Sequence, residues 1–280
     1  MSTFKTRLIT GIFIVAVYAI MYFLGATAVT AFTTLMMLFA IVELRNAFRN
    51  INVKINYVPI MVAVFLKATL SYVLKTFEST SYLIPLEKVI FAVLVLTLFI
   101  TYVFDLTEKR LLNFGMSLMT ALYIVYIGTF FSNYTSENHH YFLVIFAITT
   151  GADVFAYLGG SLLGKKKLCP KVSPKKTVEG AVCGILGAIV LGLVPIHFIF
   201  PSVKIDFKLI VALFVLGILA EIGDLFASGI KRATGIKDYG DLLPGHGGIL
   251  DRFDSLLFVS FGLYICLLYT SDAADDSLRV

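Results

Sequence analysis

Long apolar runs separated by short polar segments recur along almost the whole chain. About nine of them approach the roughly 20 residues that a helix needs to cross a bilayer. Their approximate positions are 8–24, 26–44, 57–74, 86–104, 111–131, 141–163, 178–200, 207–230 and from 249 onward. Gly25 is the expected break between the first two. The pattern predicts an all-α integral membrane protein, a polytopic bundle of about nine transmembrane helices.

The composition agrees with this prediction. Of the 280 residues, 59% are apolar and 15% are charged, whereas an ordinary soluble domain is about 45–50% apolar. No linker is long enough to separate two soluble domains, and no internal repeat stands out. We therefore expect one membrane-embedded domain over residues 1–265. Its first apolar run is expected to stay as an uncleaved helix, because no small-residue cleavage site follows it.

The end of the chain departs from the pattern. After Ile265 it reads CLLYTSDAADDSLRV, so an apolar run stops early and turns acidic without a plausible helix stop. This run resembles translated sequencing-adaptor read-through from an assembled gene, and the alternative is a genuine polar tail. We treat residues 266–280 as a doubtful tail and assign it no function.

Basic residues gather in alternate polar segments. If the N-terminus is cytoplasmic, most of the 23 basic residues fall on the cytoplasmic side, where an excess of Lys and Arg is typical. They are Lys5, Arg7, Arg45, Arg49, Lys54, Lys109, Arg110, the six lysines of 165–176, Lys231, Arg232, Lys237 and Arg252. The net charge of +5 suits anionic partners such as lipid head groups or polyphosphates. The alternative is that most of these residues only anchor cytoplasmic loops.

One strongly basic segment joins the sixth and seventh runs. Asp153 and Tyr157 share a helical face before it, and Glu179 begins the next helix. Ser173 or Thr177 could cap that helix, whose first backbone N–H groups favour phosphate. A positive anchor is the alternative, but six lysines exceed what an anchor needs. The segment therefore predicts phosphate binding, by Lys165, Ser173, Lys175, Lys176 and Thr177.

Two carboxylates lie within the eighth run. Glu221 and Asp224 are three residues apart and share a helical face. Because they would repel each other, we expect a cation between them, and a divalent ion with oxygen ligands meets this need. The alternatives are neutralisation by Lys231 or Arg232, and a proton relay in a transporter.

The segment from Glu221 to Asp254 holds six carboxylates and four basic residues in an otherwise apolar region. A glycine-rich turn around His246 lets backbone approach a ligand closely, although a lone loop histidine is more often just a polar residue. Asp251 and Asp254 are again three residues apart, where the ninth helix begins. A short helical hairpin would bring the two carboxylate pairs together, so Asp224 and Asp251 could share one metal ion.

The same residues carry a resemblance to a known family. Within 228–254 the runs S-G-I-K-R, K-D and L-P-G-H-G-G-I-L-D-R-F-D resemble the signature of the phosphatidate cytidylyltransferases. The upstream D-x-x-A-Y and S-P-K-K-T-x-E-G segments and the nine-span layout are also similar to that family. The resemblance implies transfer of a cytidylyl group from CTP to phosphatidate, with release of pyrophosphate. It further implies Mg²⁺, with K⁺ as a second ion, and places the family's metal-binding aspartates on Asp224 and Asp251.

The expected site combines both arguments. For the chemistry we expect Asp224, Asp251, Lys231, Arg232, His246 and Arg252. For substrate phosphates we expect Lys165, Ser173, Lys175, Lys176, Thr177 and Lys237. For the metal we expect Asp224 and Asp251, with Glu221 and Asp254 as further ligands or supporting groups.

The expected partners and location follow from this site. They are CTP, phosphatidate and bilayer lipid, without nucleic acid, and a homodimer is left open. The expected location is the cell membrane of a bacterium, with the N-terminus and the active site in the cytoplasm. The rival functions are a CTP-dependent lipid kinase and an ion-coupled membrane transporter.

Overall fold

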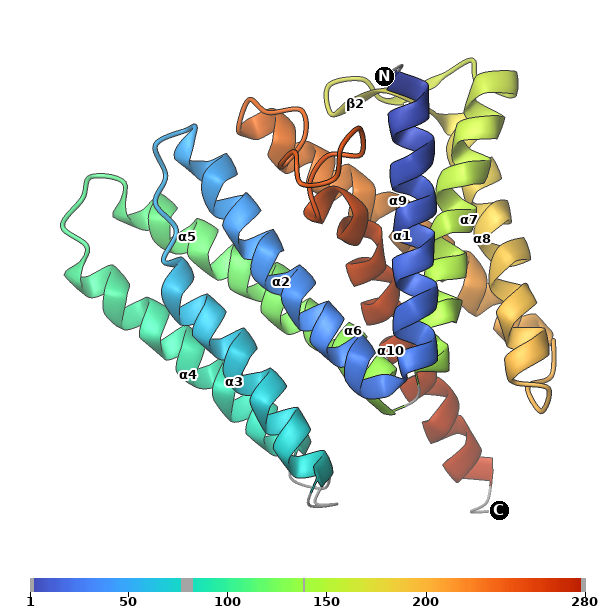
Figure 1. Ribbon diagram of the computed structural model, residues 1–280, viewed down its shortest axis with the longest axis horizontal. Coiled ribbons are helices and arrows are strands. Elements are labelled where there is room, and N and C mark those ends of the chain that lie inside the picture. Colours follow the sequence, from blue (N-terminus) through green and yellow to red (C-terminus); the bar gives the residue numbers. More distant parts are fainter. Residues whose placement is uncertain (1–2, 77–82, 138, 278–280) are drawn as a thin grey trace. The chain divides into compact units, whose positions relative to one another are not determined.

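The computed structural model describes residues 3–76, 83–137 and 139–277. Most of these residues are helical, and the elements are labelled in Figure 1. The helices are α1 Thr3–Leu24, α2 Ala26–Arg49, α3 Tyr57–Thr76, α4 Leu83–Phe104, α5 Arg110–Thr120, η2 Ala121–Tyr126, α6 Ile127–Glu137, α7 His140–Leu163, α8 Val178–Ile199, α9 Phe207–Ala233 and α10 Leu250–Ser277. Two short strands, β1 Lys167–Cys169 and β2 Ser173–Thr177, complete the list.

Eight of the nine predicted spans each coincide with one helix, with limits that differ by at most about five residues, and the fifth falls on α5, η2 and α6 together. Gly25 separates α1 from α2 with a backbone φ of 87°, which suits glycine. Among the described residues, six helices are long and apolar enough to cross a membrane, and 9–24 and 57–73 form shorter apolar helices. The architecture is therefore that of an all-α polytopic membrane protein, while the count of nine spans stays a prediction.

Three local features differ from expectation. The fifth span, α5 to α6, contains the π-helical segment η2. The basic segment before α8 is an antiparallel β-hairpin, in which Lys167 pairs with Thr177 and Cys169 with Ser173. Helix α10 continues to Ser277, well into the doubtful tail, and residues 278–280 of that tail lie outside the described residues.

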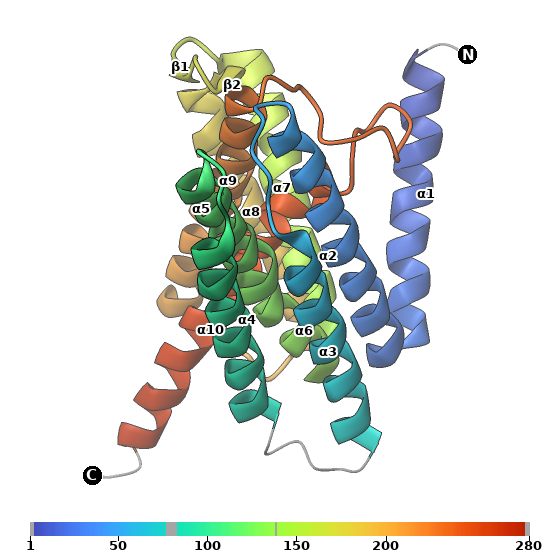
Figure 2. The ribbon, with the colours of Figure 1, turned by 90° about the vertical axis from the view of Figure 1, so that its left-hand side faces the viewer.

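The chain divides into two compact units, so the single domain expected over 1–265 stays a prediction. Unit 1 contains residues 1–137 and 231–251, and unit 2 contains residues 138–230 and 252–280. In unit 1, α2 packs on α3 and α6, and α3 packs on α4 (Figure 2). Its fully buried side chains include Ile41, Leu44 and Phe131.

Unit 2 is organised by the close packing of α7 and α8, which lie side by side in Figure 1. Small residues make this approach possible. A Cβ added to Gly180 would lie 2.8 Å from the Ala156 carbonyl oxygen, and one added to Gly184 would lie 2.9 Å from that of Ala152. Such small-residue contacts are typical of helix pairs in membranes, where dispersion rather than water exclusion holds helices together.

Candidate functional site

A charged cavity of about 340 Å³ lies within unit 2. It is lined by α7, by the second strand of the hairpin, by the start of α8 and by α9. The lining residues are Asp153, Ala156, Tyr157, Gly160, Ser161, Lys175, Lys176, Thr177, Gly180, Ala181, Glu221 and Asp224. The basic segment and the carboxylate pair, predicted separately from the sequence, therefore face one cavity.

Lys176 lies between the two carboxylates of α9. Its Nζ is 2.6 Å from Glu221 Oε2 and 2.6 Å from Asp224 Oδ2. An ammonium group from β2 thus pairs with these carboxylates, whereas Lys231 and Arg232 were the neutralising partners considered from the sequence, and the divalent ion expected between them stays a prediction. Gly184 leaves room for Glu221, since a Cβ there would lie 2.6 Å from Glu221 Oε1.

The ion pairs change the acidity of Lys176. Burial by itself lowers its pKa, but the charges of Asp224 and Glu221 outweigh burial and raise the pKa to about 12. Stability from these pairs is complete below the ordinary lysine pKa of 10.5 and is lost as pH rises through about 12. Lys176 therefore stays charged throughout the physiological range.

The start of α8 holds the hairpin in place. Thr177 is the N-cap residue, and its Oγ1 accepts a hydrogen bond from Gly180 N at 3.1 Å, so Thr177 rather than Ser173 caps this helix. Glu179 reaches back, and its Oε2 accepts hydrogen bonds from the backbone N–H groups of Lys165 at 3.0 Å and Lys166 at 3.2 Å. These contacts explain the acidic residue at the start of the span and hold the hairpin that carries Lys176.

Asp153 is a cavity residue that the predicted site set left out. It projects from α7 and lines the cavity with Lys176 and Asp224. The signal was present in the sequence, because a lone carboxylate in an apolar span is by default a functional candidate.

A second charged arrangement lies within unit 1, around Asp251. Its Oδ1 is 2.6 Å from Lys231 Nζ. Its Oδ2 accepts hydrogen bonds from Tyr239 N at 2.8 Å and from Gly248 N at 2.9 Å. Lys231 also lies 5.5 Å from the centre of the Tyr239 ring. Asp251 thus closes the loop between α9 and α10 at both of its ends.

Glu43 of α2 is a buried residue of this arrangement that sequence reasoning missed. Its Oε1 accepts a hydrogen bond from Ile249 N at 2.8 Å, and its Oε2 accepts one from Leu250 N at 2.7 Å. The available signal was again an acidic residue inside an apolar helix. Its partners lie more than 200 residues away, so no local pattern reveals them.

The remaining predicted residues lie as follows. His246 donates its backbone N–H to the Leu243 carbonyl oxygen, and its ring approaches Gly11 of α1. Arg232 Nη1 donates to the Ile236 carbonyl oxygen at 3.2 Å.

Four further predicted residues differ mainly in exposure. Lys165 and Lys237 are exposed, as is Arg252. Asp254 is buried, and its Oδ1 accepts a hydrogen bond from Ser255 N at 2.7 Å.

The carboxylates suit a hard divalent ion in their chemistry. Glu221 and Asp224 supply oxygen donors and already gather one cation, which fits the ligand preference of Mg²⁺. Within the described residues, no group of three or more His, Cys, Asp or Glu side chains is close enough to hold a metal ion. Asp224 belongs to unit 2 and Asp251 to unit 1, so an ion shared between them stays a prediction.

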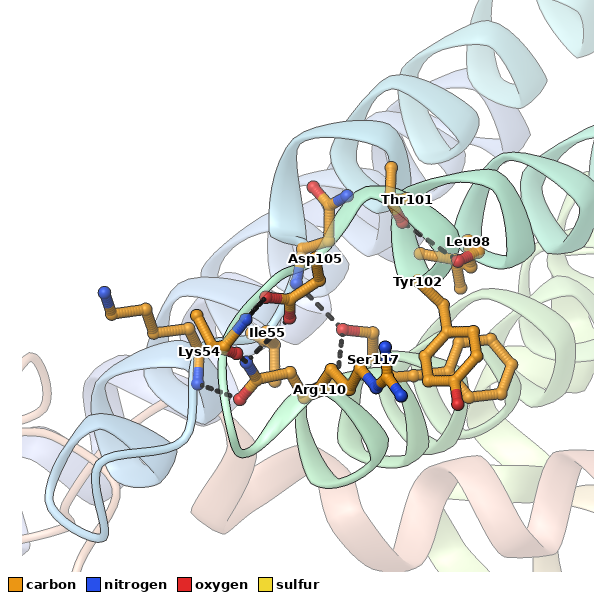
Figure 3. A pocket seen from close by; sticks show the side chains of 12 residues that line it. Lys54, Ile55, Leu98, Thr101, Tyr102, Asp105, Arg110 and Ser117 are labelled. Atoms are coloured by element: carbon orange, nitrogen blue, oxygen red, sulfur yellow. Dashed lines mark hydrogen bonds between the residues drawn. The ribbon is translucent and has the colours of Figure 1, made fainter.

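A different polar cavity, of about 270 Å³, lies within unit 1 (Figure 3). Asn113 is one of its lining residues. Asn113 Oδ1 accepts a hydrogen bond from Lys54 N at 2.9 Å, and Asn113 Nδ2 donates to Asp105 Oδ2 at 3.0 Å. Ser117 Oγ accepts from Asn56 N at 2.8 Å. These bonds tie the segment after α2 to α5 and to the end of α4.

Comparison with known proteins now identifies the class. Residues 5–270 match the Cytidylyltransferase family, so the chain belongs to that family, as the signature predicted. It is similar to proteins named phosphatidate cytidylyltransferase in three staphylococci. It is 32% identical over 267 residues to that of Staphylococcus haemolyticus (strain JCSC1435), covering 94% of this chain and 99% of the relative.

The other two relatives match a shorter region. The chain is 39% identical over 173 residues to the protein of Staphylococcus aureus (strain COL), which covers 61% of this chain and 66% of the relative. It is 41% identical over 175 residues to that of Staphylococcus epidermidis (strain ATCC 35984), covering 61% and 67%.

Proposed function

We propose that this protein is a phosphatidate cytidylyltransferase, which converts CTP and phosphatidate into CDP-diacylglycerol and pyrophosphate. The observation that carries the proposal is the cavity in which Lys176 meets Glu221 and Asp224 among apolar helices. Membership of the Cytidylyltransferase family and the names of the relatives support the same reaction. They do not favour the transporter or the lipid kinase.

The chemistry needs charge compensation more than it needs a strong base. The attacking group is an oxygen of the phosphatidate phosphate, which is already largely anionic near neutral pH because the second pKa of a phosphomonoester is about 6. A bond forms from this oxygen to the α-phosphorus of CTP. The bond from that phosphorus to the bridging oxygen breaks, and its electron pair leaves with pyrophosphate. The main obstacle is repulsion between two polyanions.

The residues of the cavity are suited to that obstacle. Lys175 and Lys176 present two positive charges beside each other on β2, where they would bind phosphate oxygens and orient the reactants. Glu221 and Asp224, and Asp251 in unit 1, are the residues that would hold Mg²⁺, with K⁺ as a second ion. When bound, these ions would offset the charge that develops on the departing pyrophosphate.

The proposed setting is the cell membrane of a bacterium, with the N-terminus and the charged cavity on the cytoplasmic side. The distribution of basic residues supports this orientation, and CTP is supplied there. Phosphatidate would reach the cavity from the bilayer past Tyr157, which lines it and is 75% exposed. A homodimer stays a prediction.

A product assay tests the proposal. Purified protein in detergent is incubated with CTP, phosphatidate and magnesium, and the lipid product, pyrophosphate and CDP are measured together. We expect CDP-diacylglycerol and pyrophosphate in equal amounts. A lipid kinase would instead transfer the γ-phosphoryl group and release CDP, so CDP formation without pyrophosphate would overturn the proposal.

A further inference from the structure

A buried carboxylate of α2 holds the end of the loop between α9 and α10. Glu43 lies near the end of α2 and is only 8% exposed. Its two oxygens accept the backbone N–H groups of Ile249 and Leu250 at 2.8 and 2.7 Å. Because Leu250 is the first residue of α10, these are N–H groups that the helix itself leaves without a partner.

The position of Glu43 within an apolar helix is energetically unfavourable, which suggests that the residue has a role. A carboxylate inside an apolar membrane helix is unfavourable, and such residues are rarely kept without a role. At the start of α10 the negative charge is favourable, since the helix dipole makes this end partly positive. The contact connects α2 to the catalytic signature more than 200 residues later in the chain.

The glycines of the signature leave space for this carboxylate. A Cβ added to Gly248 would lie 2.8 Å from Glu43 Oε2, and one added to Gly240 would lie 3.0 Å from Glu43 Oε1. Side chains at these positions would therefore push Glu43 away from its two N–H partners. The glycine-rich turn lets the Glu43 carboxylate approach the backbone closely.

The same turn orients Asp251. The N–H group of Gly248 is donated to Asp251 Oδ2 at 2.9 Å, and the next two N–H groups are donated to Glu43. Three successive backbone groups are thus shared between two carboxylates. Without the two hydrogen bonds to Glu43, the backbone of residues 248–250 would no longer be fixed, and the Gly248 N–H group that orients Asp251 could move.

We infer that Glu43 is a positioning residue for the cytidylyltransferase reaction. It touches no substrate; it fixes the turn of residues 248–250 and thereby holds Asp251 in its working orientation. This inference rests on the proposed function. The competing explanation is that Glu43 is only a buried anchor, whose removal lowers stability and nothing else.

The test compares Glu43→Gln with the parent protein. Gln keeps the size and one accepting oxygen, but its amide NH₂ faces a second N–H group and cannot accept from it. We expect kcat to fall about ten- to hundredfold, because misplacing a catalytic group by about 1 Å can cost about a hundredfold. The KM for CTP should change much less. Hydrogen–deuterium exchange without substrate should be faster in peptides that cover residues 239–250.

Glu87→Gln is the matched control. Glu87 of unit 1 also has a carboxylate that is only 8% exposed. Its Oε1 lies 3.7 Å from Lys67 Nζ and its Oε2 accepts a hydrogen bond from Asn133 Nδ2 at 2.8 Å, and both of these partners lie outside residues 239–250. We expect this variant to lower thermal stability while the folded protein keeps the parental kcat and the parental exchange in 239–250. If Glu43→Gln also kept the parental kcat, or lost activity only in proportion to unfolded protein as Glu87→Gln would, the positioning role would be wrong.

Gly248→Ala supplies an independent route if Glu43→Gln folds poorly. It should reproduce the loss of kcat, and the double variant should be no worse than the more damaged single, because both changes disturb one contact. Additive losses would contradict the inference. The exchange measurement needs no substrate, and the product assay on the parent comes first, so failure of the proposed reaction is distinguishable from failure of the role of Glu43.

Discussion

The polar cavities around Asn113 and around Lys176 are built on different principles. The one around Asn113 in unit 1 is a network in which amide, hydroxyl and backbone groups and the Asp105 carboxylate satisfy one another and join neighbouring segments. The one around Lys176 in unit 2 collects charges on helices that are otherwise apolar. Removing charges from water costs several kcal/mol per ion, so a chain keeps such a cluster for a use. We therefore propose that the first cavity supports the fold and the second supports the chemistry.

Removal of divalent metal should have the largest effect on the second region. We expect turnover to collapse in excess EDTA and to return when magnesium is added back, because the carboxylates suit a hard cation. The measurement is the initial rate of CDP-diacylglycerol formation. Full turnover after metal removal would contradict the metal role of these carboxylates.

Neutralising one aspartate at a time should be nearly as damaging. Asp224→Asn and Asp251→Asn keep size and one oxygen but lose the charge, and each should reduce activity by more than about tenfold, or ~1.4 kcal/mol in the barrier. If both bind one ion, the double variant should be scarcely worse than a single one.

Whether Asp224 and Asp251 bind one ion is tested by the initial rates and melting temperatures of the two single variants and the double variant. Two separate structural ion pairs, Lys176 with Asp224 and Lys231 with Asp251, would instead give roughly additive losses of stability.

The two neighbouring lysines of β2 should differ in importance. Lys175→Ala/Lys176→Ala should weaken the use of CTP or phosphatidate, with most of the loss coming from Lys176→Ala, because Lys176 makes both ion pairs. Removing one partner of a buried pair destabilises by about 3–5 kcal/mol, reduced here because Lys176 is partly exposed.

The single variants distinguish the contribution of Lys175 from that of Lys176. Magnesium should restore part of the thermal stability of Lys176→Ala, since another cation can then lie between Glu221 and Asp224. If the double variant matched the parent at limiting substrate, the lysines would act only as anchors.

Changes in the first region should affect stability alone, and modestly. Asn113→Ala removes the acceptor of Lys54 N and the donor to Asp105, which should cost about 1–2 kcal/mol in the free energy of unfolding and leave kcat unchanged. Hydrogen bonds from Asn113 and Thr107 hold the pKa of Asp105 below its ordinary value. Their contribution is therefore fully present above the ordinary aspartate pKa and is lost as pH falls through the lowered pKa of Asp105 in the folded protein. Melting temperatures of the parent and of Asn113→Ala, measured as a function of pH, check this contribution. A loss of kcat in Asn113→Ala would contradict the purely structural role of this cavity.

The positions of the spans could be predicted from the sequence, whereas the pairings between them could not. Apolar length is a local signal, and it located the limits of α3, α7 and α8 to within two residues. The partner of Glu221 is Lys176, 45 residues away, and the partners of Glu43 are further still. Such contacts depend on how helices pack, which the local pattern does not contain.

The same distinction applies within the candidate site. Thr177 was a predicted cap because capping is a short-range rule, and the structure confirms it. The hairpin that carries Lys176 was missed, because lysine-rich sequence has little strand propensity and its strands are stabilised by Glu179 and Thr177 at the start of the next helix.

The most direct test of the different roles of the two cavities compares two matched substitutions, Asp224→Asn and Asp105→Asn. Each replaces one aspartate by asparagine, the first in the cavity around Lys176 and the second in the hydrogen-bond network around Asn113. The initial rate of CDP-diacylglycerol formation and the melting temperature are measured for both. We predict that Asp224→Asn still folds but forms CDP-diacylglycerol more than about tenfold more slowly. Asp105→Asn should keep the parental rate. A folded Asp224→Asn protein with the parental rate, or an equal loss of rate in Asp105→Asn, would contradict this prediction.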